Sequence, residues 1–379
     1  MKIIVAPDSF KGSVTALQAA HAIEQGLHRV FPDAIIEKIP MADGGEGTIQ
    51  SLVDATGGKI KTAQVLDPLE NEIDAKFGIL ADGQTAVIEM ASASGLTLVP
   101  PEKRNPLTTT TYGTGQLIRK ALDLGCKRLI IGIGGSATND GGAGMAEALG
   151  VKFTNEDGKP IERGGGGLRT LASIDMTDLH PAIAKTETVV ACDVNNPLTG
   201  PNGASHVYGP QKGATPEMIK LLDANLRHYD EILAKAFGQS YNNISGAGAA
   251  GGLGAGLMAF LNAELKLGVD IVIDTVNLKE RMKDASLVIT GEGQIDYQTA
   301  YGKTPVGVAK VAKAENIPVI AIAGGIGEGA EAVYDAGIDA MLGIVQAPMS
   351  LDDAVEDAQR LIANAAEQAA RLLVIGRIV

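Results

Sequence analysis

The sequence predicts a two-domain α/β protein, in which a Rossmann-like parallel α/β domain carries a second, inserted α/β domain. Three observations support this fold class. Short apolar runs alternate with helical periods at both ends of the chain. The 48 glycines suit the many tight turns that such an alternation needs. The length of 379 residues is typical of about two domains.

The N-terminal segment shows this alternation first. An apolar strand over 2–6 precedes a helical pattern over 14–29, and a second strand over 34–39 precedes a helix over 48–56. Ser13 is a candidate N-cap for the first helix. In parallel α/β domains, ligands bind beyond the carboxyl ends of the strands. The loops that follow these two strands are therefore candidate ligand loops.

The pattern then changes. Strands over 61–66, 72–80 and 85–90 are joined by turns without a helical period, which predicts an antiparallel patch. A helix over 108–124 leads into a buried strand over 129–133. The strand-loop-helix form of this segment favours the parallel domain.

The middle of the chain is rich in turns. Residues 151–173, with four consecutive glycines at 164–167, read as a flexible surface loop. A strand over 188–192 and a helix over 215–236 follow. The glycine run over 246–256 suits either a phosphate site or close helix packing.

The final third returns to the alternation of strands and helices seen at the N-terminus. Strands over 285–290, 319–323 and 340–345 enclose a helix over 304–314, and a long helix over 351–375 ends the chain. The predicted boundaries are 1–60, 108–148 and 268–379 for the parallel domain, and 61–107 and 149–267 for the inserted domain.

Composition narrows the function classes. The net charge of −13 argues against nucleic acid as a partner, because phosphate backbones are bound by excess Lys and Arg. No apolar run approaches about 18 residues, so no membrane span is expected. A strand pattern begins at residue 2 and ends before the apolar region of a signal peptide could develop, so we expect a cytoplasmic protein. Cys126 and Cys192 are too far apart to suggest a metal knuckle. Nothing in the sequence indicates the oligomeric state.

The most distinctive loop spans Gly132 to Gly144, between a strand and a helix. Glycine lets the backbone approach a ligand closely, and a helix N-terminus presents free N–H groups to an anion. Gly134, Gly135 and Ser136 are therefore candidate phosphate ligands. The alternative is a tight turn that only packs against a neighbour.

Acidic and hydroxyl side chains recur after strands or in loops, most of them beside glycine. Carboxylates around a phosphate normally need a hard cation such as Mg²⁺ between them, and Lys11, Lys212 and Lys303 could offset phosphate charge. This inventory suits phosphoryl transfer, although each acid alone could be a helix cap or a turn residue. The pairs are Asp8/Ser9, Asp43/Glu46, Ser136/Asp140, Asp193/Asn196 and Glu292/Asp296.

The ordered series of motifs is more specific than any one of them. The segments that carry it are 6–11, 42–48, 89–96, 132–144, 191–194, 208–213, 246–256 and 290–296. Together they resemble the type I glycerate kinases, a bacterial family that phosphorylates D-glycerate with ATP. Gln294 departs from the pattern, since we associate an arginine with this position in the family.

The resemblance implies an active site in a cleft between two α/β domains, with Mg²⁺ and ATP as cofactors, D-glycerate as substrate and a phosphoglycerate as product. It also implies a set of site residues. They are Asp8, Ser9, Lys11, Asp43, Gly44, Gly45, Ser136, Asp140, Asp193, Glu292 and Asp296.

Physical reasoning assigns roles within this set. We expect Lys11 to offset charge on the transferred phosphoryl group, and Asp43 to orient or deprotonate the glycerate hydroxyl. Asp193 or Asp296 is the expected Mg²⁺ ligand, and Asp193 joins Lys11 and Asp43 as the catalytic set. The residues expected to bind substrate or ATP are Asp8, Ser9, Gly44, Gly45, Gly134, Gly135, Ser136, Asp140 and Glu292.

Two other functions fit the same residues. An isomerase or lyase acting on a phosphorylated sugar acid would use the glycine loops to hold a substrate phosphate. A binding protein for a small acid would need no catalysis, but the excess of carboxylates argues against a receptor for an anion. The sequence does not distinguish phosphorylation at the 2-hydroxyl from phosphorylation at the 3-hydroxyl.

Overall fold

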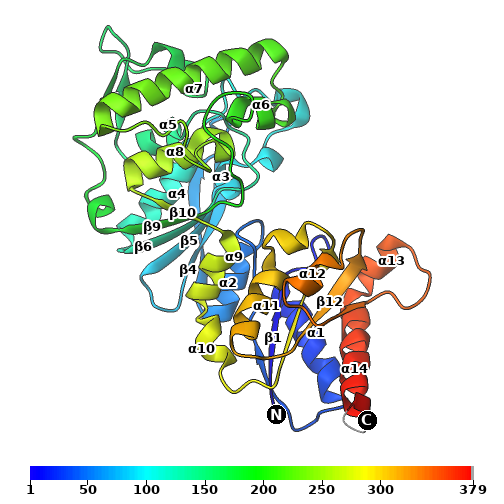
Figure 1. Ribbon diagram of the computed structural model, residues 1–379. Coiled ribbons are helices and arrows are strands. Elements are labelled where there is room, and N and C mark those ends of the chain that lie inside the picture. The colour runs from blue at the N-terminus through cyan, green and yellow to red at the C-terminus, as the bar shows by residue number, and fades with distance from the viewer. Residues whose placement is uncertain (377–379) are drawn as a thin grey trace. The chain divides into compact units, whose positions relative to one another are not determined.

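The computed structural model describes residues 1–376 and divides the chain into two compact units. Unit 1 comprises Met1–Asp43, Gln50–Gly57 and the chain from Val269 onward. Unit 2 comprises Gly44–Ile49 and Gly58–Gly268. In Figure 1, unit 1 carries the blue N-terminal and the orange to red C-terminal segments, and unit 2 carries the cyan to green ones.

Unit 1 is built on a five-stranded, fully parallel sheet with the order β13-β12-β11-β1-β2. The two central strands are covered on both faces, which explains why they read as continuous apolar runs. The strands are β1 (Lys2–Pro7), β2 (Ile35–Lys38), β11 (Leu287–Ile295), β12 (Val319–Ile326) and β13 (Ala340–Gly343).

Helices cover this sheet, and α1 packs side by side with α14 at the C-terminal end of the chain (Figure 1). Gly26 permits this contact because it has no side chain. A Cβ at this position would lie only 2.8 Å from the Cβ of Ala366. The helices are α1 (Ala16–His28), α2 (Thr48–Thr56), α9 (Gly268–Thr275), α10 (Leu278–Met282), η6 (Thr299–Tyr301), α11 (Thr304–Ala314), α12 (Ala332–Asp335), α13 (Leu351–Glu356) and α14 (Ala358–Gly376).

The N-cap of α1 is Thr15 and not Ser13. The Thr15 hydroxyl accepts a hydrogen bond from the Gln18 backbone N–H, and the Gln18 side chain accepts one from the Thr15 N–H, which together form a capping box. The Ser13 hydroxyl instead donates to the Val355 carbonyl at 2.9 Å. The sequence prediction was wrong because two hydroxyl residues stand close together before the helix.

Unit 2 is built on a six-stranded sheet with the order β10-β9-β6-β5-β4-β3. Strands β10 to β5 run parallel, while β5, β4 and β3 form the predicted antiparallel patch, which is confirmed. A separate hairpin pairs β7 with β8. The strands are β3 (Lys59–Leu66), β4 (Glu72–Ile79), β5 (Thr85–Glu89), β6 (Arg128–Gly132), β7 (Lys152–Thr154), β8 (Ser173–Asp175), β9 (Glu187–Ala191) and β10 (Glu264–Lys266).

The helices of unit 2 enclose a large apolar core, which includes Phe77, Leu129 and Tyr229. No helix within residues 1–376 is long and apolar enough to span a membrane. The helices are α3 (Ala91–Ser94), η1 (Leu96–Leu98), η2 (Pro101–Lys103), α4 (Tyr112–Asp123), α5 (Ala143–Ala148), η3 (Gly167–Thr170), η4 (Pro181–Lys185), α6 (Ala204–Tyr208), η5 (Pro210–Lys212), α7 (Pro216–Phe237) and α8 (Ala249–Leu261).

The domain boundaries differ from the prediction, since Gly44–Ile49 and residues 58–60, expected with the chain ends, belong to unit 2. The largest difference lies further along the chain. Residues 108–148 were expected in the domain of the chain ends, but α4, β6 and α5 belong to unit 2. The reason is that β6 lies between two parallel partners in the second sheet, with Ile130 opposite Val87 of β5 and Val189 of β9. A strand-loop-helix rhythm indicates a parallel sheet but does not say which of two parallel sheets the strand joins.

The glycines at 164–167 are not a flexible surface loop. Three of the four are buried, and the Gly165 carbonyl accepts a hydrogen bond of 2.8 Å from the buried Asn225 side chain. A side chain on Gly165 would collide with the Asn139 carbonyl. These glycines therefore allow close packing inside unit 2.

Candidate active site

Three carboxylates and a lysine gather in unit 1, and we call them the acid cluster: Asp8, Lys11, Asp43 and Glu292. Strands β1 and β11 are neighbours with Pro7 opposite Gly291, so Asp8 and Glu292 follow at the same edge of the sheet. The chain enters Asp43 from β2 at the same edge, since the Met41 N–H donates to the Pro7 carbonyl at 2.9 Å. The tertiary structure thus brings together four residues that the sequence singled out.

Asp8 is almost completely buried, with 5% of its surface exposed. One carboxylate oxygen accepts the Ser9 N–H at 2.6 Å, and the other accepts the Thr304 hydroxyl at 2.7 Å. Burial, together with the negative charge of Asp43, raises the pKa of Asp8 to about 6. Ser9 therefore acts through its backbone in holding this carboxylate.

Glu292, like Asp8, is a carboxyl group with a raised pKa. Its Oε1 accepts the Thr299 hydroxyl at 2.7 Å. Burial raises the pKa of Glu292 to about 7, aided by the charges of Asp8 and Asp43 and opposed by Thr299 and Lys303. A carboxyl group that titrates near neutral pH can both accept and release a proton there.

Lys11 supplies the positive charge of the acid cluster. Its Nζ lies 3.2 Å from Asp43 Oδ2, and its side chain is 65% exposed. Burial alone would lower the pKa of Lys11, but the carboxylates, above all Asp43, raise it. Lys11 is therefore a protonated and accessible cation beside the acids, which suits an anionic ligand.

A second candidate region lies entirely in unit 2, where a cavity of about 540 Å³ opens beside the glycine loop. This volume is in the range of small-molecule sites. Gly44 must be glycine, because its φ is +89° and a Cβ would lie 2.7 Å from the Ala191 side chain. The lining includes Gly44, Gly45, Glu46, Glu89, Gly134 and Gly135.

Glu89 is a cavity residue that the sequence analysis did not select. It ends β5, and its Oε1 accepts the Ile49 N–H at 2.9 Å. Burial raises the pKa of Glu89. The sequence could have indicated Glu89, since it is an acid at the carboxyl end of a strand. It was passed over because β5 was predicted as part of an antiparallel patch, where strand ends do not share one edge.

Lys212 supports the glycine loop from inside the protein. Its Nζ donates to the Ser136 hydroxyl at 2.6 Å and to the Thr138 carbonyl at 2.7 Å. Only 1% of Lys212 is exposed, and burial lowers its pKa to about 7 against the opposing charge of Asp140. Lys212 therefore has almost no exposed surface with which to contact a phosphate, and its offset of phosphate charge stays a prediction. Lys212 holds Ser136, which is itself 6% exposed.

Asp140 also has a different role from the predicted one. It has no exposed surface, and its oxygens accept hydrogen bonds from the Thr111 hydroxyl and N–H and from the N–H groups of Gly142 and Gly144. A carboxylate enclosed in this way does not contact a ligand. Asp140 instead ties the end of the glycine loop to the start of α4, so direct substrate binding by this residue is corrected to a positioning role.

The two predicted metal ligands belong to different units. Asp193 Oδ1, in unit 2, accepts the Gly268 N–H at 3.0 Å. Asp296 Oδ1, in unit 1, accepts the Gln298 N–H at 2.9 Å and shapes the turn before η6. Within residues 1–376 there is no group of three or more His, Cys, Asp or Glu side chains suited to a metal ion. The metal assignments therefore stay predictions.

Parallel sheets, glycine-lined loops and acids at the carboxyl ends of strands are typical of α/β enzymes that act on small anionic ligands. The comparisons with known proteins agree with this class. The model of the glycerate kinase family matches residues 3–374, and the chain belongs to this family. The resemblance drawn from the motifs is thereby confirmed.

Relatives cover almost the whole chain. A glycerate kinase of Halalkalibacterium halodurans is 57% identical over 98% of this chain and 97% of its own length. A glycerate 2-kinase of Escherichia coli K12 is 52% identical over 99% of both chains. A crystal structure from Salmonella typhimurium LT2, assigned as a glycerate kinase 2, is 49% identical with a TM-score of 0.93 over 100% of both chains. The predicted α/β fold class is confirmed.

Proposed function

We propose that this chain transfers the γ-phosphoryl group of ATP to a hydroxyl of D-glycerate, giving 2-phosphoglycerate and ADP. The observation that carries the proposal is identity above 50% over nearly the full length with relatives named glycerate kinases. The name of the Escherichia coli relative, glycerate 2-kinase, supports the 2-hydroxyl as the acceptor. None of these relatives is named as an isomerase or lyase, so the alternative drawn from the sequence has no support from them.

The acid cluster is the proposed centre of proton transfer. An alcohol is a weak nucleophile at neutral pH, so a carboxylate within hydrogen-bond reach is the expected helper. Asp43 remains our candidate from the sequence, with Lys11 beside it to offset the charge of the transferred group. Glu292 is a second candidate for the base, because its pKa of about 7 matches the working pH better than that of an ordinary carboxyl group.

The glycine loop is the proposed phosphate site. Gly134 and Gly135 are exposed to the cavity, where their backbone can approach an anion closely. Ser136, held by Lys212, would add a hydroxyl donor. The same loop could instead bind the glycerate carboxylate. Replacing Ser136 by Ala should raise the KM for ATP in the first case and the KM for glycerate in the second.

Mg²⁺ is proposed as the companion of ATP. It is usually bound by one or two protein carboxylates together with phosphate oxygens, so a cage of protein ligands is not required. Asp296 fits this pattern, because it is partly exposed and, within residues 1–376, its Oδ2 accepts no hydrogen bond. Asp193 is the other candidate. When bound, the ion would offset negative charge on the phosphates.

The proposed cellular location and partners follow from the substrates. ATP and D-glycerate are small molecules of the cytoplasm, which is the proposed location, and neither a nucleic acid nor a membrane is needed as a partner. The location of the active site in a cleft between the two domains stays a prediction.

A coupled assay for ADP release, with ATP, Mg²⁺ and D-glycerate, tests the proposal. ADP should form only when D-glycerate is present, and a lack of ADP would refute the kinase function. ³¹P NMR of the product identifies the phosphorylated hydroxyl. Asp43→Asn and Asp193→Asn should each lower turnover, and near wild-type turnover of Asp43→Asn at saturating substrate would remove Asp43 as the base.

A further inference from the structure

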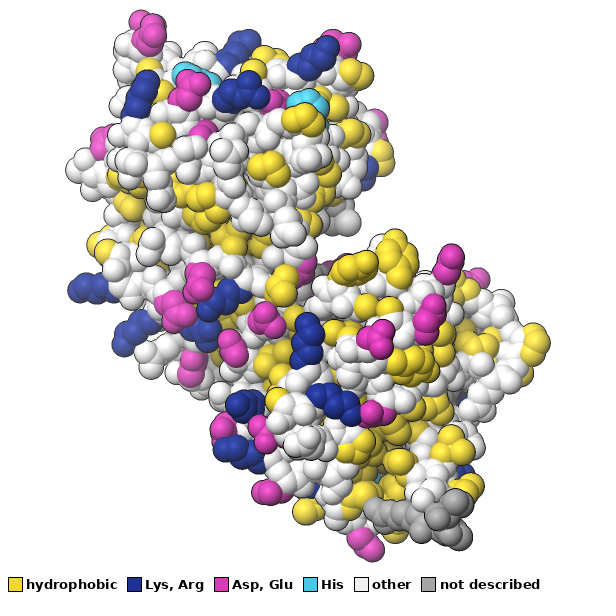
Figure 2. Space-filling model, viewed as in Figure 1, with side chains coloured by type: hydrophobic (Ala, Val, Ile, Leu, Met, Phe, Trp, Pro, Cys, Tyr) yellow, Lys and Arg dark blue, Asp and Glu magenta, His cyan; other side chains and the backbone are white. Residues whose placement is uncertain are grey.

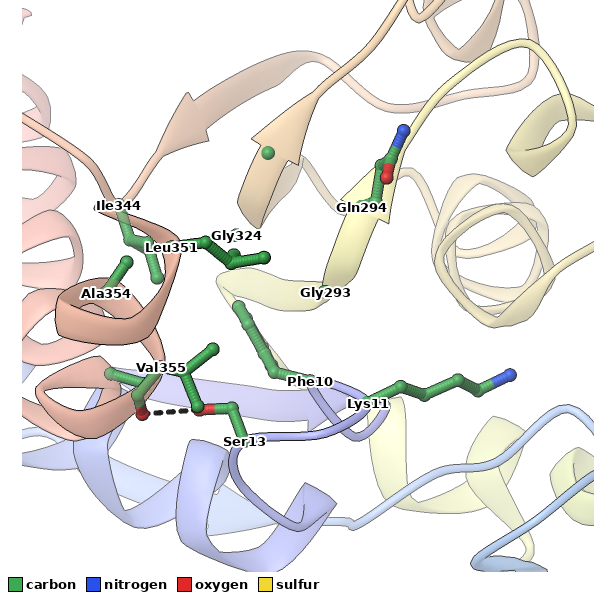
Figure 3. A pocket seen from close by; sticks show the side chains of 12 residues that line it. Phe10, Lys11, Ser13, Gly293, Gln294, Gly324, Ile344, Leu351, Ala354 and Val355 are labelled. Carbon is green, nitrogen blue, oxygen red and sulfur yellow. Dashed lines mark hydrogen bonds between the residues drawn. The ribbon is translucent and has the colours of Figure 1, made fainter. Parts of the chain in front are cut away.

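Unit 1 contains a hollow of its own, and Lys11 of the acid cluster lines one part of it. It has a volume of about 210 Å³ and lies between the loop after β1, the ends of β11 and β12, and helix α13 (Figure 3). We call it the β12 pocket. Its lining is mostly apolar or backbone, and includes Phe10, Gly293, Gly325, Ile344, Leu351 and Val355.

Part of the wall of the β12 pocket is apolar and open to solvent, whereas Phe10 is only 3% exposed and belongs to the apolar core of unit 1. Figure 3 shows the Phe10 ring and the Leu351 side chain extending into the same space from opposite sides. Leu351 is 78% exposed, and Val355 on the same helix is 37% exposed. Figure 2 shows apolar side chains open to solvent on unit 1. Exposed apolar walls of this kind gain free energy when a ligand covers them.

The floor of the pocket offers polar backbone groups. Strand β13 ends at Gly343, opposite Ala323, while β12 continues to Ile326. The Ala323 carbonyl points toward β13, because it accepts the Ile344 N–H at 2.9 Å. Backbone groups of alternate residues in a strand point to the same side. Gly325 therefore directs its N–H and C=O to the side where β13 has already ended.

The β12 pocket is continuous with the acid cluster. Gly293, which lines the pocket, directly follows Glu292 in β11, and Phe10 directly precedes Lys11. Figure 3 shows the Lys11 side chain extending away from the apolar walls, toward Asp43. A ligand with a flat ring and an anionic tail could therefore place its ring against Leu351 and Val355 and its charge beside Lys11.

We propose that the β12 pocket binds the adenine ring of ATP. The ring lies against Leu351 and Val355, its edge exchanges hydrogen bonds with the Gly325 backbone, and the phosphates leave the pocket past Lys11. A purine has both features that the pocket requires, an apolar face and an edge with a donor and acceptors. This inference rests on the proposed kinase function, because it assigns the binding site of the phosphoryl donor.

Filling the pocket tests the assignment. Gly325 has an ordinary φ, and within residues 1–376 no atom lies within 4 Å of a Cβ built on it, so Gly325→Leu adds a side chain to open space. We expect the KM for ATP to rise by about tenfold or more, as for other changes of pocket shape, while the KM for D-glycerate stays unchanged. The smaller Gly325→Ala should have a weaker effect in the same direction. An unchanged KM for ATP in Gly325→Leu would overturn the proposal.

A fluorescence experiment tests binding without catalysis. The chain contains no Trp, so Leu351→Trp places a single reporter at the mouth of the pocket. ADP alone should change its emission, whereas Leu372→Trp, which is 61% exposed on α14, should not respond. An equal response of both reporters, or none at Leu351→Trp, contradicts adenine binding here. If ADP binds at this reporter but no ADP is released with D-glycerate, the kinase proposal fails while the pocket assignment stands.

Discussion

Burial shifts the pKa of several titratable side chains toward neutral pH. Asp8, Glu292 and Lys212 are all enclosed, yet only Glu292 combines a pKa of about 7 with a place beside the accessible cation Lys11. Lys212 has a pKa of about 7 as well, but its ammonium group faces the protein interior. A pKa near 7 therefore makes Glu292 a candidate for catalysis, whereas in Lys212 it accompanies internal support of the glycine loop.

The first prediction concerns Glu292 as a proton acceptor. A base must be deprotonated to act, so kcat/KM of the wild type should rise with pH and level off above about 7. Glu292→Gln should lower kcat by about 100-fold or more and remove this rise. Steady-state rates between pH 5.5 and 8.5 check it, with Glu315→Gln, an exposed acid after α11 that has no proposed role, as the control. An unchanged pH profile in Glu292→Gln would leave Asp43 as the base.

The second prediction uses the buried Lys212 and its effect on stability. Its pKa is about 7 in the folded protein and 10.5 in the ordinary state, so between these values the unfolded chain binds more protons. Stability should therefore rise with pH in this window, by up to about 1.4 kcal/mol per pH unit. Lys212→Met should lack this increase. Urea unfolding at pH 7.5 and 9 measures it, and parallel slopes for both proteins would contradict the shift.

At the scale of elements, glycine sets how closely helices and loops approach. Gly26 lets α1 pack directly on α14, and the glycines at 164–167 bring the chain against the Asn139 and Glu162 carbonyls. The left-handed backbone of Gly251 and Gly252 lies at the start of α8, where side chains would collide with the glycine loop. Close packing therefore explains several glycines that could equally have lined a phosphate site.

The third prediction concerns the contact between α1 and α14. Gly26→Ala should favour the isolated helix by about 1 kcal/mol, but the added methyl group would collide with the Ala363 carbonyl and lie 2.8 Å from the Ala366 side chain. We expect the collision to dominate and to cost about 1–3 kcal/mol of unfolding free energy. Thermal unfolding checks it against Gln25→Ala on the exposed face of α1. A higher melting temperature for Gly26→Ala would show that the helices separate easily.

At the scale of the whole molecule, each unit has its own sheet and its own apolar core. The core of unit 1 includes Ile289 and Ile362, and that of unit 2 includes Leu129 and Tyr229. A region with its own core can unfold locally while the rest of the chain stays folded. Substitutions in one core should therefore report on that unit.

The fourth prediction tests this separation. Leu129 is fully buried in β6, so Leu129→Ala should cost about 2–5 kcal/mol. Hydrogen exchange measured by mass spectrometry should speed up in the strands of unit 2 and stay near the wild-type rate in β1 and β11 of unit 1. Ile289→Ala should give the opposite pattern. An equal increase throughout the chain would show that the two units unfold as one.

Local patterns predicted most of the architecture. The apolar runs that became β1, β11 and β12 and the antiparallel patch were visible because the strand period and turn chemistry are properties of short segments. Residues at strand ends, such as Asp8 and Glu292, could be selected because the carboxyl ends of neighbouring parallel strands share one edge. The family followed from the order of these motifs along the chain.

The sequence by itself thus determined the fold class, the strand-end acids and the family. Only the tertiary structure decided that β6 joins the sheet of unit 2, since pairing depends on partners far away in the chain. It alone also separated Asp140 and Lys212, which support the glycine loop, from Lys11, which can meet a ligand. The physical reason is that exposure is set by packing from every side, and no local pattern of residue types records it.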